Sequence, residues 1–257
     1  MDELRRALDF MSWFENSCAE RVVPWRWGVT LFNSKFPKLY MLNFVRVEGT
    51  PPDLNFEELV AEADALHGVA GHAHRDVVIE DAHVGAALAP AFRKSGWEVS
   101  TLVLMAYRGE RRLPATRYDV HELTSDELRA MRADSYSVGP SARDLETVRQ
   151  MIDKDAHIAR AGGARFFGAV VDGQAVCSAD LYSDGATAQI ESVLTLEPFR
   201  KRGLARAVVA EAIRAAFDAG HDFVFLLADD EDWPKELYAR MGFEPLGRCY
   251  DFLKAPD

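Results

Sequence analysis

The sequence predicts an α/β protein built from two similar units, each with a central, mostly antiparallel mixed sheet flanked by helices. Apolar runs rich in β-branched residues alternate with segments whose apolar residues recur at helical spacing. The segment 75–98 also aligns without gaps with the segment 221–244, in the same order of strand, loop, helix, glycine-aromatic pair and strand. With 257 residues, of which 48% are hydrophobic, the chain is long enough to form two cores.

The first unit is expected to begin with an amphipathic helix that ends near Cys18. Two β-rich runs follow, at 21–32 and 38–47, and the turn-like stretch between them predicts that they form a hairpin. A loop at 48–55 contains two adjacent prolines and leads into a helix whose N-cap is Asp53 or Asn55.

The polar segment 105–117 predicts a linker, so that the units are 1–114 and 115–257. A short strand at 117–123 then leads to a helix that Thr124 and Glu127 start as a capping box. A second helix is expected from about Ser141 to Ala156. Beyond it, turn signals at Asp172-Gly173 and Asp184-Gly185 divide the region 166–195 into three antiparallel strands.

Composition excludes several classes of function. The net charge of -11 argues against general nucleic-acid binding, and no apolar run is long enough to span a membrane, so we expect a cytoplasmic protein. The cysteines lack the spacing of a disulfide framework or a zinc site, and no metal is expected. Three histidines likewise lack partners at the spacing of a metal site or a catalytic triad. The residues in question are Cys18, Cys177 and Cys249, and His121, His157 and His221.

The segment 187–215 carries the strongest chemical signal. A buried strand is followed by a basic turn and by an amphipathic helix that starts near Gly203. The first amide N–H groups of a helix have no partner within it, and the helix dipole favours an anion there. Because glycine has no β-carbon, a phosphate could approach the backbone closely. Arginine and lysine side chains at 200–202 and Arg206 add positive charge, so the turn predicts a pyrophosphate site.

The spacing Arg200-x-x-Gly203-x-Ala205 resembles the R/Q-x-x-G-x-G/A signature of the GNAT superfamily of acyl-CoA-dependent N-acyltransferases. Further along, the motif Leu237-Tyr238-x-x-x-Gly242-Phe243 is similar to a second motif of that family. The resemblance covers roughly 117–253 and implies a GNAT domain. The equivalent place in the first unit, 48–55, has neither the motif nor a basic cluster, and its prolines remove amide donors. A tandem arrangement with a degenerate first domain is therefore implied.

The resemblance also implies acetyl-CoA as co-substrate and assigns roles to residues. The main chain of the strand end holds the pantetheine arm, and the turn and helix start hold the pyrophosphate. The residues expected to bind the cofactor are Leu194, Thr195, Leu196, Arg200, Arg202, Gly203, Leu204, Ala205, Arg206 and Ala207. Tyr238 is the candidate acid that protonates the thiolate, or else an aromatic of the core. Glu191 is the candidate base, or else a solvated carboxylate. The acids at 229–232 either attract a cationic acceptor or form a solvated loop.

These residues favour an N-acetyltransferase that transfers the acetyl group directly to a small-molecule or amino-acid-like amine. One alternative is a protein that senses acyl-CoA without turnover. Another, suggested only by the tandem arrangement, is a mycothiol-synthase-like acetyltransferase that acts on a cysteinyl sugar. The expected partners are acetyl-CoA and the amine, without nucleic acid or membrane. Neither the acceptor nor the oligomeric state follows from the sequence.

Overall fold

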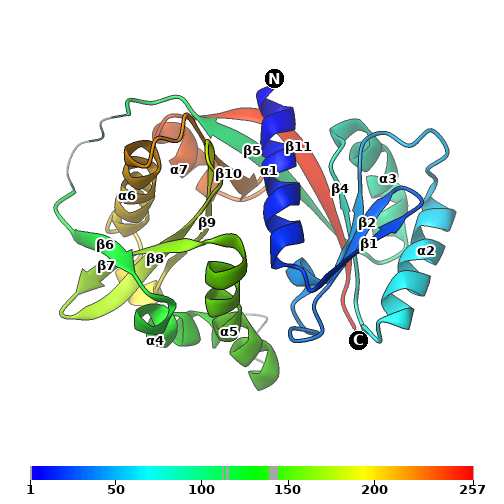
Figure 1. The fold of residues 1–257 in the computed structure, drawn as a ribbon, viewed down its shortest axis with the longest axis horizontal. Helices are drawn as coiled ribbons and strands as arrows, with labels where there is room; N and C mark the ends of the chain where they lie inside the picture. The colour runs from blue at the N-terminus through cyan, green and yellow to red at the C-terminus, as the bar shows by residue number, and fades with distance from the viewer. Residues whose placement is uncertain (1, 112, 114–115, 139–143, 257) are drawn as a thin grey trace. The chain divides into compact units, whose positions relative to one another are not determined.

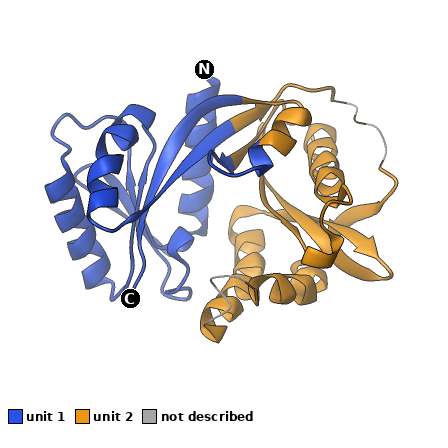
Figure 2. Ribbon diagram, turned by 180° about the vertical axis from the view of Figure 1, so that it is seen from behind, with its two compact units in different colours: residues 1–104, 228–235, 245–257 blue, residues 105–227, 236–244 orange. Residues whose placement is uncertain are grey.

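The protein is described from a computed structural model that defines residues 2–111, 113, 116–138 and 144–256 (Figure 1). The fold is mixed α/β, as predicted. Two compact units emerge, coloured separately in Figure 2: unit 1 comprises 1–104, 228–235 and 245–257, and unit 2 comprises 105–227 and 236–244. The expected domain boundary at 114/115 and the expected helix start at Ser141 lie outside the described residues.

Unit 1 contains strands in the spatial order β1-β2-β3-β4-β11-β5. They are β1 (Arg21–Trp25), β2 (Gly28–Phe32), β3 (Val45–Val47), β4 (Arg75–Ile79), β11 (Phe243–Lys254) and β5 (Glu98–Tyr107). The first β-rich run holds two strands, so its hairpin turns at Arg26-Trp27, and β2 then pairs with β3. The expected antiparallel pairing of the two runs is thus confirmed by β2 and β3, and the additional hairpin within the first run was not predicted. Gly28 lets β2 and β3 approach closely, since a β-carbon there would lie 2.2 Å from the Arg46 carbonyl oxygen of β3.

Helices cover both faces of this sheet. Alternate residues of a strand point to opposite faces. Val45 and Val47 join the apolar cluster formed with α2 (Phe56–Val69) and α3 (Ala82–Lys94). Arg46, between them, turns the other way and contacts Glu15 of α1 (Glu3–Cys18). The start of α2 agrees with the sequence, because the Asn55 side chain accepts from the Glu58 amide.

Unit 2 contains strands in the order β5-β10-β9-β8-β7-β6. They are β10 (Phe223–Asp229), β9 (Thr187–Thr195), β8 (Gln174–Ser183), β7 (Arg165–Val171) and β6 (Asp119–Leu123). Its helices are α4 (Ser125–Tyr136), α5 (Leu145–Gly162), α6 (Leu204–Asp218) and α7 (Pro234–Arg240). α6 packs on β7, β8 and β9, and α4 packs on β8. The predicted capping box forms at Thr124, whereas α5 continues beyond the expected end to Gly163, whose φ of 67° closes it.

The internal repeat is visible in the order of elements. β4-α3-β5 in one copy corresponds to β10-α7-β11 in the other. Gly96 and Gly242 end the two helices with φ values of 77° and 97°, and the aromatic residues after them, Trp97 and Phe243, are both buried. The last strands of the repeats are shared: β5 and β11 each contribute residues to both units, and β11 pairs with β4 of the first copy.

Candidate active site

The site begins where β9 parts from its parallel neighbour β10. The two strands pair from Thr187↔Phe223 to Ile190↔Leu226, and the pairing ends there although both strands continue. On its other side β9 stays paired with β8 as far as Thr195, with a bulge at Ser192, whose φ is 51°. The main chain of 191–195 therefore has no strand partner on the β10 side. An extended ligand could bind its backbone groups there, as an added strand would.

Beyond β9 the chain turns into the N-terminus of α6. Gly203 is the N-cap, with φ 85° and ψ 9°, and no side chain caps the helix. A β-carbon at Gly203 would meet only the Tyr118 hydroxyl, at 3.9 Å. The first turn of α6 contains no acidic residue, so its free amide groups and the helix dipole together make an anion site.

The structure brings the residues predicted to bind the cofactor together along this connection. Leu194 and Thr195 end β9, Leu196 precedes a short 3-10 helix (Glu197–Phe199), and Gly203 to Ala207 form the helix start. The Arg200 Nε donates to the Thr195 carbonyl at 3.2 Å, and the Arg202 Nη2 donates to the Pro198 carbonyl at 2.8 Å. These two arginines thus shape the turn.

The other side chains of the turn divide by exposure. Leu204 and Ala207 are buried against the sheet, so only their main chain is available to a ligand. Ala205 is partly exposed, and Arg206 is exposed beside the first turn of α6. Arg206 is therefore the arginine of the helix start that could add charge to a bound phosphate.

The equivalent helix of unit 1 has the opposite character. The side chain of Asn55 caps α2 by accepting from the Glu58 amide at 3.0 Å, and Glu57 and Glu58 lie in the first turn. Arg26 is held there by Asp53 and Glu58. A helix start that is already capped and carries carboxylates repels an anion.

Glu191 lies on the unpaired part of β9. Its side chain is partly buried, and Gln189 Nε2 donates to its Oε1 at 2.8 Å. Burial, assisted by the negative charge of Asp180, raises the pKa of Glu191 to about 7 against the opposing hydrogen bond from Gln189. A carboxyl group with a pKa near 7 can accept a proton at neutral pH and release it again.

Tyr238 lies on α7 and is 7% exposed. Its ring packs edge-on against Phe243, with the ring centroids 6.1 Å apart. Burial raises the pKa of Tyr238, and the charges of Glu191 and Cys177 raise it further, so the phenol stays protonated at neutral pH.

A buried ion network beside β8 was missed by sequence reasoning. Arg132 of α4 is fully buried, and its Nη1 and Nη2 lie 2.5 Å from Asp155 Oδ2 and Asp180 Oδ1. Lys154 Nζ lies 3.6 Å from Asp155 Oδ1. Asp180 also accepts from the Tyr182 hydroxyl at 3.4 Å. The available signal was a charged residue on the apolar face of a predicted helix, one turn after Leu128.

Cys177, a buried free thiol on β8, lies beside the end of β9. Its Sγ lies 3.1 Å from the Thr195 Oγ1, and burial raises its pKa to about 11. The acids at 229–232, in contrast, are partly neutralised within unit 1. Asp230 pairs with Lys235 at 3.1 Å and with Arg248 at 2.7 Å.

None of the described helices is long and apolar enough to cross a membrane. Residues 122–243 match the Acetyltransferase (GNAT) family. A sequence comparison with curated proteins finds no match.

Solved structures share the fold over most of the chain. A functionally unknown conserved protein from Staphylococcus epidermidis has a TM-score of 0.73 at 18% identity, covering 93% of this chain and 95% of that one. A GCN5-related N-acetyltransferase from Kribbella flavida has a TM-score of 0.64 at 19% identity, covering 100% and 97%. A tandem GNAT protein from the clavulanic acid biosynthesis pathway has a TM-score of 0.55 at 16% identity, covering 81% and 74%.

Proposed function

We propose that the protein is an acetyl-CoA-dependent N-acetyltransferase, since residues 122–243 match the GNAT family and the fold is similar to that of a tandem GNAT protein. Its acceptor is a small-molecule or amino-acid-like amine, and the active domain is 115–257. The observation that carries this proposal is the open edge of β9 followed directly by the uncapped N-terminus of α6.

The chain's own residues fit acetyl-CoA, which when bound would supply a thioester as the acyl donor. The main chain from Arg202 to Ala207 would hold the pyrophosphate through the amides that precede the first bond of the helix, which runs from the Ala207 amide to the Gly203 carbonyl at 3.2 Å, with Arg206 beside them. The main chain from Glu191 to Leu196 would bind the pantetheine arm. Unit 1 has a capped and acidic helix start at the equivalent place, so we expect one CoA molecule per chain.

Two side chains would then move protons. Glu191 would take a proton from the amine so that the nitrogen can attack, and Tyr238 would give its hydroxyl proton to the departing sulfur. The amine thereby gains the acetyl group, the carbon–sulfur bond breaks, and CoA leaves as the thiol. Direct transfer requires both groups in one environment, which their electrostatic coupling supports.

The first experiment measures thiol release from acetyl-CoA with a panel of amines. Tyr238→Phe keeps the packing of the ring and removes the proton, so kcat should fall roughly 100-fold while CoA affinity is retained. Tyr107→Phe is the matched control, because that ring also packs against Phe243, with centroids 5.2 Å apart. An equal rate for Tyr238→Phe and the parent would mean that Tyr238 only packs in the core and does not donate the proton. CoA binding without turnover of any amine would favour the alternative of a protein that senses acyl-CoA without catalysis.

The second experiment tests the base through pH. Glu191 is ionised above its pKa of about 7, so kcat/KM should rise as the pH rises through 7, and Glu191→Gln should lose this limb. The exposed Glu236 on α7 provides the control Glu236→Gln. The pKa of Glu191 is raised from its ordinary value of 4.5 to about 7 in the folded protein, so its ionisation lowers the free energy of unfolding as the pH rises between these two values, and the loss is complete above pH 7. Glu191→Gln should therefore be more stable than the parent at pH 8, in addition to losing activity.

A further inference from the structure

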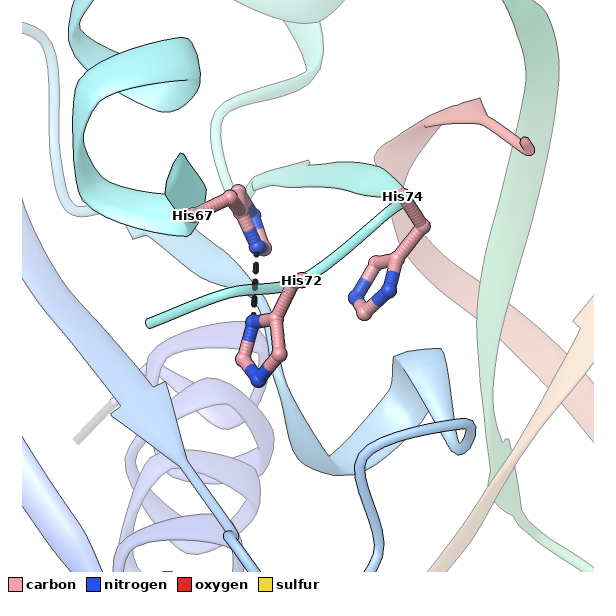
Figure 3. A group of neighbouring side chains, drawn as sticks. All are labelled: His67, His72 and His74. Carbon is pink, nitrogen blue, oxygen red and sulfur yellow. Dashed lines mark hydrogen bonds between the residues drawn. The ribbon is translucent and has the colours of Figure 1, made fainter. Parts of the chain in front are cut away.

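Three histidines of unit 1 converge at the C-terminal end of α2. His67 lies in the last turn of that helix, and His72 and His74 lie on the segment that leads into β4. Figure 3 shows the three imidazoles facing a common space. Their ring nitrogens, one from each residue, lie within 4.8 Å of one another, and this is the group that could hold a metal ion among the described residues.

The spacing of the nitrogens suits a metal ion. His67 Nδ1 and His72 Nδ1 are 3.2 Å apart. Two nitrogens bound tetrahedrally to zinc at about 2.0–2.1 Å are separated by roughly 3.3–3.4 Å. One edge of a tetrahedron is therefore already present, and the third nitrogen reaches its place by a shift of about 1.5 Å or less, within the range of small side-chain rotations.

The outer nitrogens are already engaged, which leaves the inner ones for a ligand. His74 Nε2 donates to the Asn43 carbonyl at 2.9 Å. His67 Nε2 lies 3.2 Å from the Asp76 carbonyl oxygen. Metal-bound histidines characteristically donate their second ring N–H to a carbonyl or carboxylate, which fixes the tautomer and the ring orientation. The amide nitrogen of Asp76 also lies 3.3 Å from His67 Nε2, so metal binding would select the His67 tautomer that carries its proton on Nε2 and presents the Nδ1 lone pair, as His74 already does.

The carbonyl that orients His74 is itself held rigidly. The Asn43 Nδ2 donates to the Phe36 and Leu39 carbonyls at 2.8 and 2.9 Å, and its Oδ1 accepts from the Asn33 amide at 2.7 Å. Support of this kind preorganises the groups that bind a ligand.

The cluster lies in the interior of unit 1. His67 and His74 are fully buried, and His72 is the least buried of the three. The guanidinium of Arg75, the residue after His74, is paired with Asp64 at 2.6 Å. Metal binding requires all three imidazoles to be neutral.

We propose that His67, His72 and His74 bind one divalent transition-metal ion of the zinc class, with water as the fourth ligand. Three imidazoles and one open position match the ligand set of zinc sites that keep an exchangeable water, and nitrogen donors select such ions over calcium and magnesium. The proposal departs from the sequence-based expectation of no metal, and it is independent of acetyl transfer because it concerns unit 1.

The test uses the untagged full-length protein after treatment with a chelator. Titration with Zn²⁺ should give one ion per chain, bound Co²⁺ should show the absorption of a four-coordinate site, and Zn²⁺ should raise the Tm. His72→Ala removes the most exposed ligand and should weaken zinc binding by at least about 100-fold without loss of fold. His83→Ala, an exposed histidine on α3, is the matched control.

Circular dichroism of His72→Ala separates loss of the ligand from loss of the fold. Should His72→Ala misfold, His72→Gln with the same titration replaces it. Zinc binding that is equal in His72→Ala and His83→Ala, or the absence of stoichiometric binding to the parent protein, would overturn the proposal.

Discussion

Replacing Gly203 tests the anion site at the start of α6 most directly. Its φ of 85° costs a residue with a β-carbon about 1–2 kcal/mol, and the nearest atom to that β-carbon is 3.9 Å away, so no clash is added. Gly203→Ala should therefore lower the free energy of unfolding by this amount. Gly220, with φ 90° and open space around it at the other end of α6, should respond equally to Gly220→Ala.

Gly203→Asp adds a negative charge where the pyrophosphate would lie. Two unit charges about 4 Å apart repel by roughly 1 kcal/mol in water and about 4 kcal/mol near a protein surface. Since about 1.4 kcal/mol corresponds to a tenfold change, the Kd for CoA should rise between about 5-fold and 1,000-fold.

Isothermal titration calorimetry with CoA measures both the Kd and the stoichiometry. Gly220→Asp is the control, with the same backbone strain and an unchanged Kd. A Gly203→Asp variant that binds CoA as the parent does, or two CoA molecules per parent chain, would refute the site. Two CoA molecules per chain would also contradict the inference that the capped, acidic N-terminus of α2 cannot bind a phosphate.

Further predictions concern stability and are read by urea denaturation. Asp180→Ala leaves Arg132 buried with one carboxylate fewer and should cost about 3–5 kcal/mol; a loss below 1 kcal/mol would contradict the buried network. Thr124→Ala removes the capping box of α4 and should cost about 1 kcal/mol, with no effect expected on CoA binding. Gly85→Ala puts a β-carbon 2.3 Å from the Tyr250 ring, so it should destabilise unit 1, and Tyr250→Ala should relieve the clash; additive losses would argue against it.

Local signals predicted local structure well. Asn55 and Thr124 cap α2 and α4 as expected because capping depends on residues within one turn. The turn at Asp172-Gly173 joins β7 and β8 for the same reason, since both of these residues adopt positive φ. The start of α6 at Leu204 also followed from a short pattern of apolar residues.

Features that depend on distant partners were not predicted. The pattern of 244–254 indicates a strand but does not specify its neighbour, and the strand pairs with β4 of the other copy. Arg132 and Asp180 resemble surface residues until the structure brings α4 onto β8. For Tyr238 and Glu191, the sequence named candidate residues, whereas the electrostatic interaction between them depends on how α7 and β9 pack.

The repeat shows that the histidine cluster is not required by the fold. The helix of unit 2 equivalent to α2 is α6, and its last turn contains no histidine. Ala216 in that turn is fully buried, as His67 is in the last turn of α2, so an apolar side chain suffices there in the other copy. Burying an imidazole in place of an apolar side chain costs desolvation that packing does not repay. The helix of unit 1 thus has an N-terminus capped by Asn55 and histidines at its C-terminal end, whereas the equivalent helix of unit 2 has an uncapped N-terminus and no histidine in its last turn. The zinc titration tests the C-terminal end of α2, and the CoA titration tests the N-terminus of α6.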